Sequence, residues 1–171
     1  MTATTLGLML TILWAGYGSV QGERSPVATS RTNSLIAIAL TRAVTEKDVP
    51  DFESIRDKQR IPLLDTTEWG QAWGEKIPLD ALPKIENVRL TLLSKEELQL
   101  QANERGAFLY LAVGKIILEA DSATICVGTQ WALPKDLDRS IVYLSGGAYE
   151  LKYFWRNRKW LFDRIGWVAV S

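Results

Sequence analysis

The spacing of apolar residues changes from helical to strand-like along the chain. In residues 34–47, SLIAIALTRAVTEK, apolar side chains recur every three or four positions and form a broad face. Asn33 or Ser34 can cap the start of this segment, and Pro50 prevents it from running much further. The pattern predicts a helix over residues 34–47.

From Ala107 onward the pattern predicts strands. Residues 107–120, 123–133, 139–155 and 159–170 are rich in β-branched and aromatic side chains. Shorter strands are predicted around residues 61–64 and 85–93. Between these groups, Ser94 and Glu97 form a capping-box pattern and Gly106 suits a helix exit, so residues 94–106 are predicted to be a second helix.

The last two strands are expected to form a hairpin whose pairing can be derived. If Asn157 and Arg158 form a two-residue turn, Trp155 faces Trp160, Tyr153 faces Phe162 and Lys152 faces Asp163. Two aromatic pairs and one ion pair would stabilise that register.

The fold class predicted from these elements is α+β. We expect residues 34–171 to form a single domain, in which the N-terminal helix packs on a curved antiparallel sheet formed mostly by residues 107–170. The alternative is a lipocalin-like β-barrel. That fold needs about eight strands, and the sequence indicates six.

The N-terminal segment indicates export. Residues 6–20 are apolar and end in small side chains, and no charged residue precedes Glu23. The run is shorter than the about 20 apolar residues that span a membrane, although no basic residue precedes it as in a typical signal peptide. We predict that residues 1–22 are a cleaved signal peptide or a retained anchor, with residues 23–33 as a linker. The domain would then be periplasmic or secreted.

Composition excludes several chemistries. The chain has no histidine and one cysteine, Cys126, so catalytic triads with histidine, disulfides within the chain and thiolate metal clusters cannot form. Twenty basic and twenty acidic residues cancel, which gives no general attraction to nucleic acid. We expect no cofactor, no metal and no nucleic-acid partner, and membrane contact only through an uncleaved N-terminal segment.

Gly146 and Gly147 raise the question of a phosphate-binding loop. Such a loop lies between a strand and a helix, whereas AYELKYFW after these glycines alternates like a strand. We interpret the glycines as a bend or bulge in one long strand.

Aromatic residues supply the candidate binding site. Seven tryptophans are many for 171 residues, and core packing accounts for most of them. Two of them, Trp69 and Trp73, occur in the loop-like TTEWGQAWG and could form the rim of a pocket. The candidate ligand-binding residues are Trp69, Trp73, Tyr110, Trp131, Tyr149 and Tyr153.

No catalytic residue can be assigned. The carboxylates have no spacing that marks an acid–base pair, and each is expected to be a surface charge or a cap; they are Asp65, Glu68, Glu75, Glu119, Asp121 and Glu150. Cys126 lies in the middle of a predicted strand and is expected to be an inert, packed thiol.

The C-terminal sequence GGAYELKYFWRNRKWLFDRIGWV, with the helix that precedes the strands, resembles the cystatin-like, nuclear-transport-factor-2-like superfamily. The resemblance covers residues 105–170, and exported bacterial proteins are also similar. The matching residues are Gly146, Gly147, Tyr149, Leu151, Tyr153, Lys159, Trp160 and Ile165. The resemblance implies a curved sheet around a helix, with a pocket between them. The superfamily includes ketosteroid-isomerase-like enzymes, whose acid–base residues have no counterparts here.

The expected function is therefore a non-catalytic ligand-binding or protein-interaction module. Its partner would be a small molecule or a protein, including a second copy of the chain. The alternative is a small cavity enzyme, of isomerase, dehydratase or hydrolase type, that transfers protons with tyrosine and Asp or Glu side chains.

Overall fold

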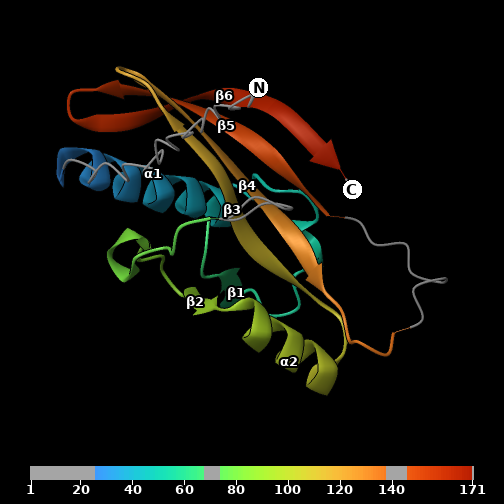
Figure 1. Ribbon diagram of the computed structural model, residues 1–171. Coiled ribbons are helices and arrows are strands. Elements are labelled where there is room, and N and C mark those ends of the chain that lie inside the picture. Colours follow the sequence, from blue (N-terminus) through green and yellow to red (C-terminus); the bar gives the residue numbers. More distant parts are fainter. Residues whose placement is uncertain (1–25, 68–73, 138–145, 171) are drawn as a thin grey trace, which may run out of the picture.

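The structure is a computed structural model that describes residues 26–67, 74–137 and 146–170. Two helices and six strands make up most of the described chain (Figure 1). In chain order they are α1 (Pro26–Thr45), β1 (Arg60–Leu64), β2 (Arg89–Leu93), α2 (Lys95–Arg105), β3 (Phe108–Leu118), β4 (Ser122–Ala132), β5 (Gly147–Arg156) and β6 (Lys159–Val170). Two short 3₁₀ turns, η1 (Phe52–Ser54) and η2 (Leu79–Ala81), lie between the first elements.

The strands form one open, mixed sheet in the order β2-β1-β3-β4-β5-β6. Strands β3 to β6 pair antiparallel, as predicted. The predicted α+β class is confirmed, and β1, which lies outside residues 107–170, adds a parallel part because it is parallel to both β2 and β3. The connection from β1 to β2 crosses over through η2, and such a crossover permits parallel pairing. Because β2 and β6 lie at opposite edges of an open sheet, the barrel alternative is not formed.

Helix α1 begins at Pro26, eight residues before the predicted start, so residues 26–33 are helical and not a linker. The polar residues that suggested a cap have other partners. Asn33 Nδ2 donates to the carboxylate of Asp80, and Ser34 Oγ donates to the carbonyl of Arg31 within the helix. Tertiary contacts with the β5–β6 hairpin hold this first part of α1, a stabilisation that local sequence does not reveal.

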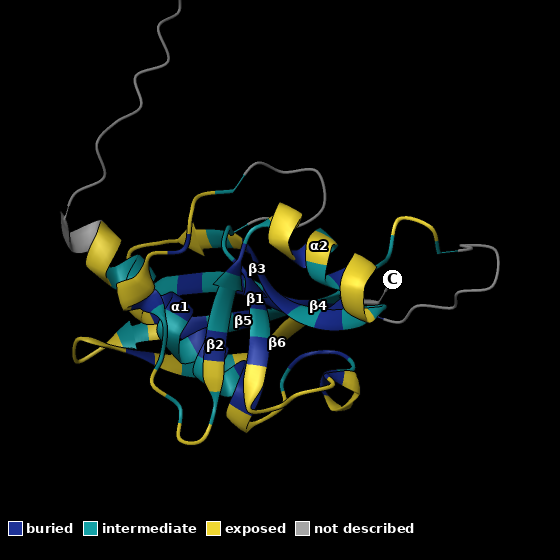
Figure 2. Ribbon diagram, turned by 90° about the horizontal axis from the view of Figure 1, so that it is seen from below, coloured by how far each residue is buried: buried dark blue, intermediate teal, exposed yellow. Residues whose placement is uncertain are grey.

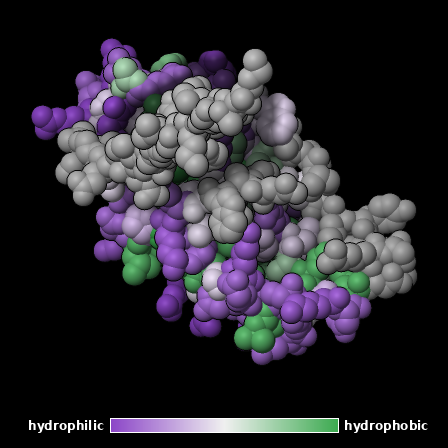
Figure 3. All heavy atoms as spheres, viewed as in Figure 1, coloured by the Kyte–Doolittle hydropathy of each residue, from purple (hydrophilic) through white to green (hydrophobic). Residues whose placement is uncertain are grey.

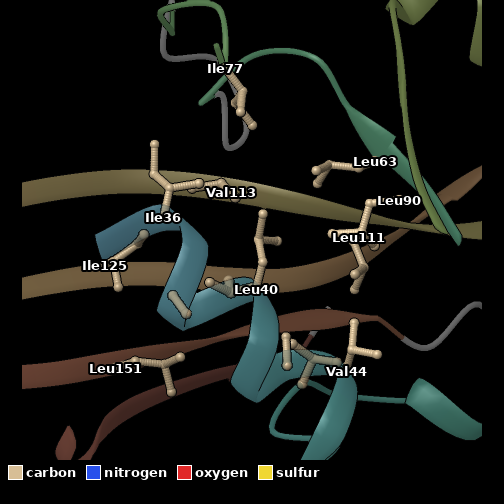
Figure 4. Packing of buried hydrophobic residues seen from close by; sticks show 14 of the residues in the cluster. Ile36, Leu40, Val44, Leu63, Ile77, Leu90, Leu111, Val113, Ile125 and Leu151 are labelled. Atoms are coloured by element: carbon tan, nitrogen blue, oxygen red, sulfur yellow. The ribbon is translucent and has the colours of Figure 1, made fainter. Parts of the chain in front are cut away.

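The core lies between α1 and one face of the sheet. Ile36, Leu40 and Val44 point from α1 toward residues of β3, β4 and β5 (Figure 4). Ile125 and Val127 of β4 are fully buried in this cluster. These side chains alternate with residues that face the other side of the sheet, as strand geometry requires.

Helix α2 covers part of the opposite face. Leu98 and Ala102 pack there against Leu64, Leu93 and Ala112 in a second, smaller cluster. The outer side of the helix is exposed (Figure 2). Its predicted ends are confirmed. Ser94 and Glu97 form both hydrogen bonds of the capping box, and Gly106 ends the helix with a positive φ of 82°.

The predicted hairpin register is confirmed near the turn and wrong farther along. Trp155 faces Trp160, and Tyr153 faces Phe162. Positive φ values at Asn157 and Arg158 give the tight turn that was expected. A bulge between Lys152 and Tyr153 then shifts the register, so Lys152 faces Arg164 and not Asp163. Lys152 lies 3.4 Å from Glu150 on its own strand, and Arg164 pairs with Asp163.

The glycine pair is followed by a strand, as predicted. Both glycines are buried, and Gly147 is the first residue of β5, with a φ of 152°. No helix begins here, so the arrangement is not that of a phosphate-binding loop. Residues 138–145 lie outside the described residues, and the bend of one long strand at these glycines stays a prediction.

Candidate functional site

A cleft of about 1000 Å³ opens beside the second half of β3. Helix α1 forms one wall with Thr29, Thr32, Asn33 and Ile36. The segment after β1 and the edge of β3 form the rest of this part of the lining. They contribute Thr67, Gly74, Glu75, Lys76 and Pro78, and Gly114, Lys115, Ile116 and Leu118. The cleft continues over the sheet to Cys126, Ala148 and Trp167.

The edge of β3 is exposed to this cleft because β1 leaves it early. Strands β1 and β3 meet at Leu63 and Leu111, and β1 ends at Leu64. On the other side, β3 continues to pair with β4 as far as Leu118. Among the described residues, therefore, no strand pairs with residues 114–118 on the cleft side. A bulge between Val113 and Ile116 lies at the start of this unpaired stretch.

The lining of the cleft combines apolar surface with a few polar groups. Ile36, Ile116 and Trp167 supply apolar surface, and the side chain of Trp167 is 60% exposed. The cations are Lys76 and Lys115. Lys76 is almost fully exposed, and its ammonium lies 4.0 Å from Asp65, which is too far to neutralise it strongly. Such a lining is suited to binding, with apolar contact for affinity and polar groups for orientation.

Cys126 lies half-buried on the outer face of β4, opposite Glu150 on β5. Burial raises the pKa of its thiol, and the charge of Glu150 raises it further, although the charge of Lys115 acts in the opposite direction. A raised pKa keeps the sulfur protonated at neutral pH, and thiols are nucleophilic only as thiolates. This environment agrees with the expectation that Cys126 is inert.

The structure does not bring the predicted aromatic residues together. Tyr110 faces away from α1, toward the α2 cluster, and its hydroxyl donates to Gln130 Oε1 at 2.7 Å. Trp131 and Tyr149 pack, partly buried, against the core below α1. Tyr153 is fully buried in that core. None of these four side chains lines the cleft. Trp69 and Trp73 lie outside the described residues, and their binding role stays a prediction.

Tyr153 has the most unusual surroundings of these residues. Its ring packs edge-on against Phe162 at 5.7 Å, and its buried hydroxyl has no hydrogen-bond partner among the described residues. Burial raises the pKa of this phenol, and the charges of Arg42 and Asp48 act on it in opposite directions. Arg42 and Asp48 form an ion pair at 2.5 Å.

The contacts of Glu119, Glu150 and Asp65 agree with the predicted surface role, whereas Glu75 lines the cleft. Glu119 accepts a hydrogen bond from Ser122 in the β3–β4 turn. Glu150 is paired with Lys152, and Asp65 lies near Lys76. Glu68 lies outside the described residues. Within residues 26–67, 74–137 and 146–170, no group of three or more metal-ligating side chains occurs.

Sequence reasoning missed the residues that α1 contributes to the cleft. Thr29, Thr32 and Asn33 fell in a segment interpreted as a linker, because serine, threonine and asparagine are common there. For the edge of β3, the sequence does contain an indication of irregular pairing. Gly114 interrupts an otherwise apolar strand pattern, and an isolated glycine of this kind suggests a bulge or a close approach of the backbone.

No family model, curated protein or solved structure matches the chain.

In the described part of the chain, no helix is long and apolar enough to cross a membrane.

Proposed function

We propose that this protein is an exported, non-catalytic binding module whose cleft takes an extended polypeptide segment. The observation that carries the proposal is the second half of β3. Its backbone edge, residues 114–118, is unpaired among the described residues and opens into a cleft of about 1000 Å³. An open strand edge is a template for a further strand, and many peptide-binding domains use it in this way.

The walls of the cleft support an extended ligand. A strand added to β3 would present alternate side chains to opposite faces of the sheet. On one face it would meet Ile36 and Thr32 of α1, and on the other it would meet the surface around Cys126 and Trp167. The backbone edge would provide affinity for any sequence, and these two surfaces would provide selectivity.

Export and family membership are part of the same proposal. The apolar residues 6–20 support a signal peptide or an anchor. Helix α1 packed on a curved sheet, together with the C-terminal aromatic hairpin, supports a cystatin-like module. In that superfamily the fold is shared by enzymes and binding proteins, so the function depends on the cleft and not on the fold alone.

The competing hypothesis is a small cavity enzyme that would use Tyr153 with Asp48. These groups influence each other electrostatically, which is the one observation in its favour. Asp48, however, is neutralised by Arg42, and neither Tyr153 nor Asp48 lines the cleft. A proton-transfer pair must reach a bound substrate, so we favour the binding module.

The test is hydrogen exchange on the full chain in the presence of a peptide library, with thermal shift as the first screen. A peptide that binds by strand addition should protect backbone amides within residues 114–118 and raise the melting temperature. Thr32→Trp should narrow the cleft from the side of α1 and weaken binding at least tenfold. Thr45→Trp places the same side chain on the same helix outside the lining, and it should bind like the wild type.

Two outcomes would reject strand addition. Either the bound peptide leaves the exchange of residues 114–118 unchanged, or Thr32→Trp and Thr45→Trp bind equally well. Turnover of a carbonyl substrate that is lost in Tyr153→Phe would favour the enzyme instead.

A further inference from the structure

The tip of the β5–β6 hairpin projects beyond the strand next to it. Strand β4 begins at Ser122, which lies opposite Phe154, and the carbonyl of Asp121 accepts a hydrogen bond from the backbone of Trp155. Residues 156–159 therefore extend past β4 as a two-stranded tip closed by a tight turn.

This tip carries cations that the fold does not neutralise. Arg156 and Lys159 lie directly opposite each other, and Arg158 occupies the turn between them. All three are exposed, and none forms an ion pair or a side-chain hydrogen bond with another described residue. Like charges in directly opposed positions destabilise a hairpin. A bound anion would remove that repulsion, so the tip is suited to an anionic partner.

The nearest acidic residues have other contacts. Glu119 and Asp121 lie in the β3–β4 turn beside the base of the tip, and Glu119 accepts a hydrogen bond from Ser122. Asp163 pairs with Arg164, farther along β6. Figure 3 shows hydrophilic residues gathered at the end of the molecule where the tip lies.

Exposed apolar side chains lie directly behind the cations. Phe154 and Leu161 face each other across the hairpin, and they are 50% and 48% exposed. Both are on the face that alternates with the buried Tyr153 and Trp160. Cations beside exposed aromatic and aliphatic side chains fit the interface between lipid headgroups and acyl chains. The phosphate backbone of a nucleic acid would contact only the cations and leave the apolar side chains without a partner.

The start of the described chain lies at the same end as the tip. Arg31 of α1 stacks on Trp155 and Trp160 at 4.8 and 4.9 Å, and Trp160 Nε1 donates to the carbonyl of Arg31. Figure 1 shows the first turns of α1 beside the hairpin. The apolar run of residues 6–20 is separated from Pro26 by residues 21–25 alone. Five extended residues span roughly 17 Å at most, so a membrane that held this run would lie close to the tip.

From these observations we infer that the β5–β6 tip docks on an anionic membrane surface. Arg156, Arg158 and Lys159 contact lipid phosphates, and Phe154 and Leu161 enter the interface behind them. The docking orients the domain relative to the membrane and is independent of ligand binding in the cleft.

The test uses the full chain with vesicles of phosphatidylcholine alone and of phosphatidylcholine with phosphatidylglycerol. The partition coefficient is measured by co-sedimentation. Three cations near an anionic surface should strengthen binding to the mixed vesicles roughly a hundredfold over the neutral ones. Added salt should weaken that preference. Hydrogen exchange of the hairpin amides should slow on mixed vesicles and remain fast on neutral ones.

Matched variants distinguish the effect of where the cations lie from the effect of the total charge of the protein. Arg156→Gln/Arg158→Gln/Lys159→Gln should lose most of the preference for mixed vesicles. Arg60→Gln/Lys84→Gln/Arg89→Gln removes the same charge near β1 and β2, away from the β6 edge, and should keep the preference. Phe154→Ser/Leu161→Ser should weaken binding to the mixed vesicles severalfold. Leu79→Ser/Leu100→Ser, at other exposed apolar positions, should leave it unchanged.

The inference is overturned if the wild type shows no lipid preference in both partition and hairpin exchange, or if the two triple variants behave alike. The N-terminal segment alone could bind the protein completely to both kinds of vesicle, and the partition coefficient would then not distinguish them. Hydrogen exchange of the hairpin amides remains the deciding measurement in that case, and equal exchange on both lipids rejects the docking. A tip variant that loses affinity for a short DNA duplex but keeps its vesicle preference would assign the cations to nucleic acid instead.

Discussion

Two buried hydroxyls on the same face of the sheet differ in their hydrogen bonds. Thr129 is fully buried, and its hydroxyl donates to the carbonyl of Pro50 at 2.8 Å. This bond ties the loop after α1 to β4, 79 positions along the chain. The hydroxyl of Tyr153 is also buried and has no such partner among the described residues. A buried polar group without a hydrogen bond costs stability, whereas a paired one contributes to it.

Tyr153→Phe should therefore leave the free energy of unfolding unchanged or raise it by about 1 kcal/mol. Thr129→Val replaces the hydrogen-bonded hydroxyl by a methyl group of similar size, and it should lower the free energy of unfolding by about 1 kcal/mol or more. Urea unfolding of both variants measures the difference. A loss above about 1 kcal/mol in Tyr153→Phe would show that its hydroxyl has a partner in solution.

At the scale of single elements, local sequence specified α2 and the β5–β6 turn well. The capping box of Ser94 and Glu97 involves residues three apart, and the turn at Asn157 and Arg158 involves adjacent ones. Neither needs a distant partner. The start of α1 and the bulges of β6 depend instead on contacts across the fold, and these were not foreseen.

Ser94→Ala should lower the free energy of unfolding by about 1 kcal/mol, because the first turn of α2 loses its side-chain acceptor. Ser94→Thr retains the hydroxyl and should lose only a few tenths of that amount. Thermal or urea unfolding is the measurement. Equal losses in the two variants would mean that the hydroxyl does not cap the helix in solution.

At the scale of the whole molecule, the two helices cover different parts of the sheet. Helix α1 packs on one face, and α2 packs on the other face near β1, β2 and β3. The outer face of β5 and β6 retains exposed apolar residues, including Phe154 and Leu161. The regions proposed for binding, the edge of β3 and the hairpin tip, lie where this coverage ends.

Leu40 is the side chain through which this arrangement can be tested. It is fully buried between α1 and the sheet, so Leu40→Ala should lower the free energy of unfolding by about 2–5 kcal/mol. Leu79 is 77% exposed in η2, and Leu79→Ala should change the free energy of unfolding by no more than about 0.5 kcal/mol. A small effect of Leu40→Ala in urea unfolding would contradict the packing of α1 on the sheet.

The sequence by itself determined the α+β class, the second helix, the four long strands and the hairpin turn. Each of these depends on side-chain period or turn chemistry within a few residues, which a linear pattern records. The sequence also excluded histidine-based catalysis and disulfides within the chain through composition alone.

Only the tertiary structure decided the parallel position of β1, the early start of α1 and the place of the cleft. The cleft exists because β1 ends at Leu64 while β3 continues to Leu118, and only the pairing of distant strands reveals that mismatch. The aromatic residues chosen from the sequence divide between two faces of the sheet for a related reason. An aromatic side chain has the same signature in a core as in a pocket, and its neighbours in space, not in sequence, determine which of the two it forms.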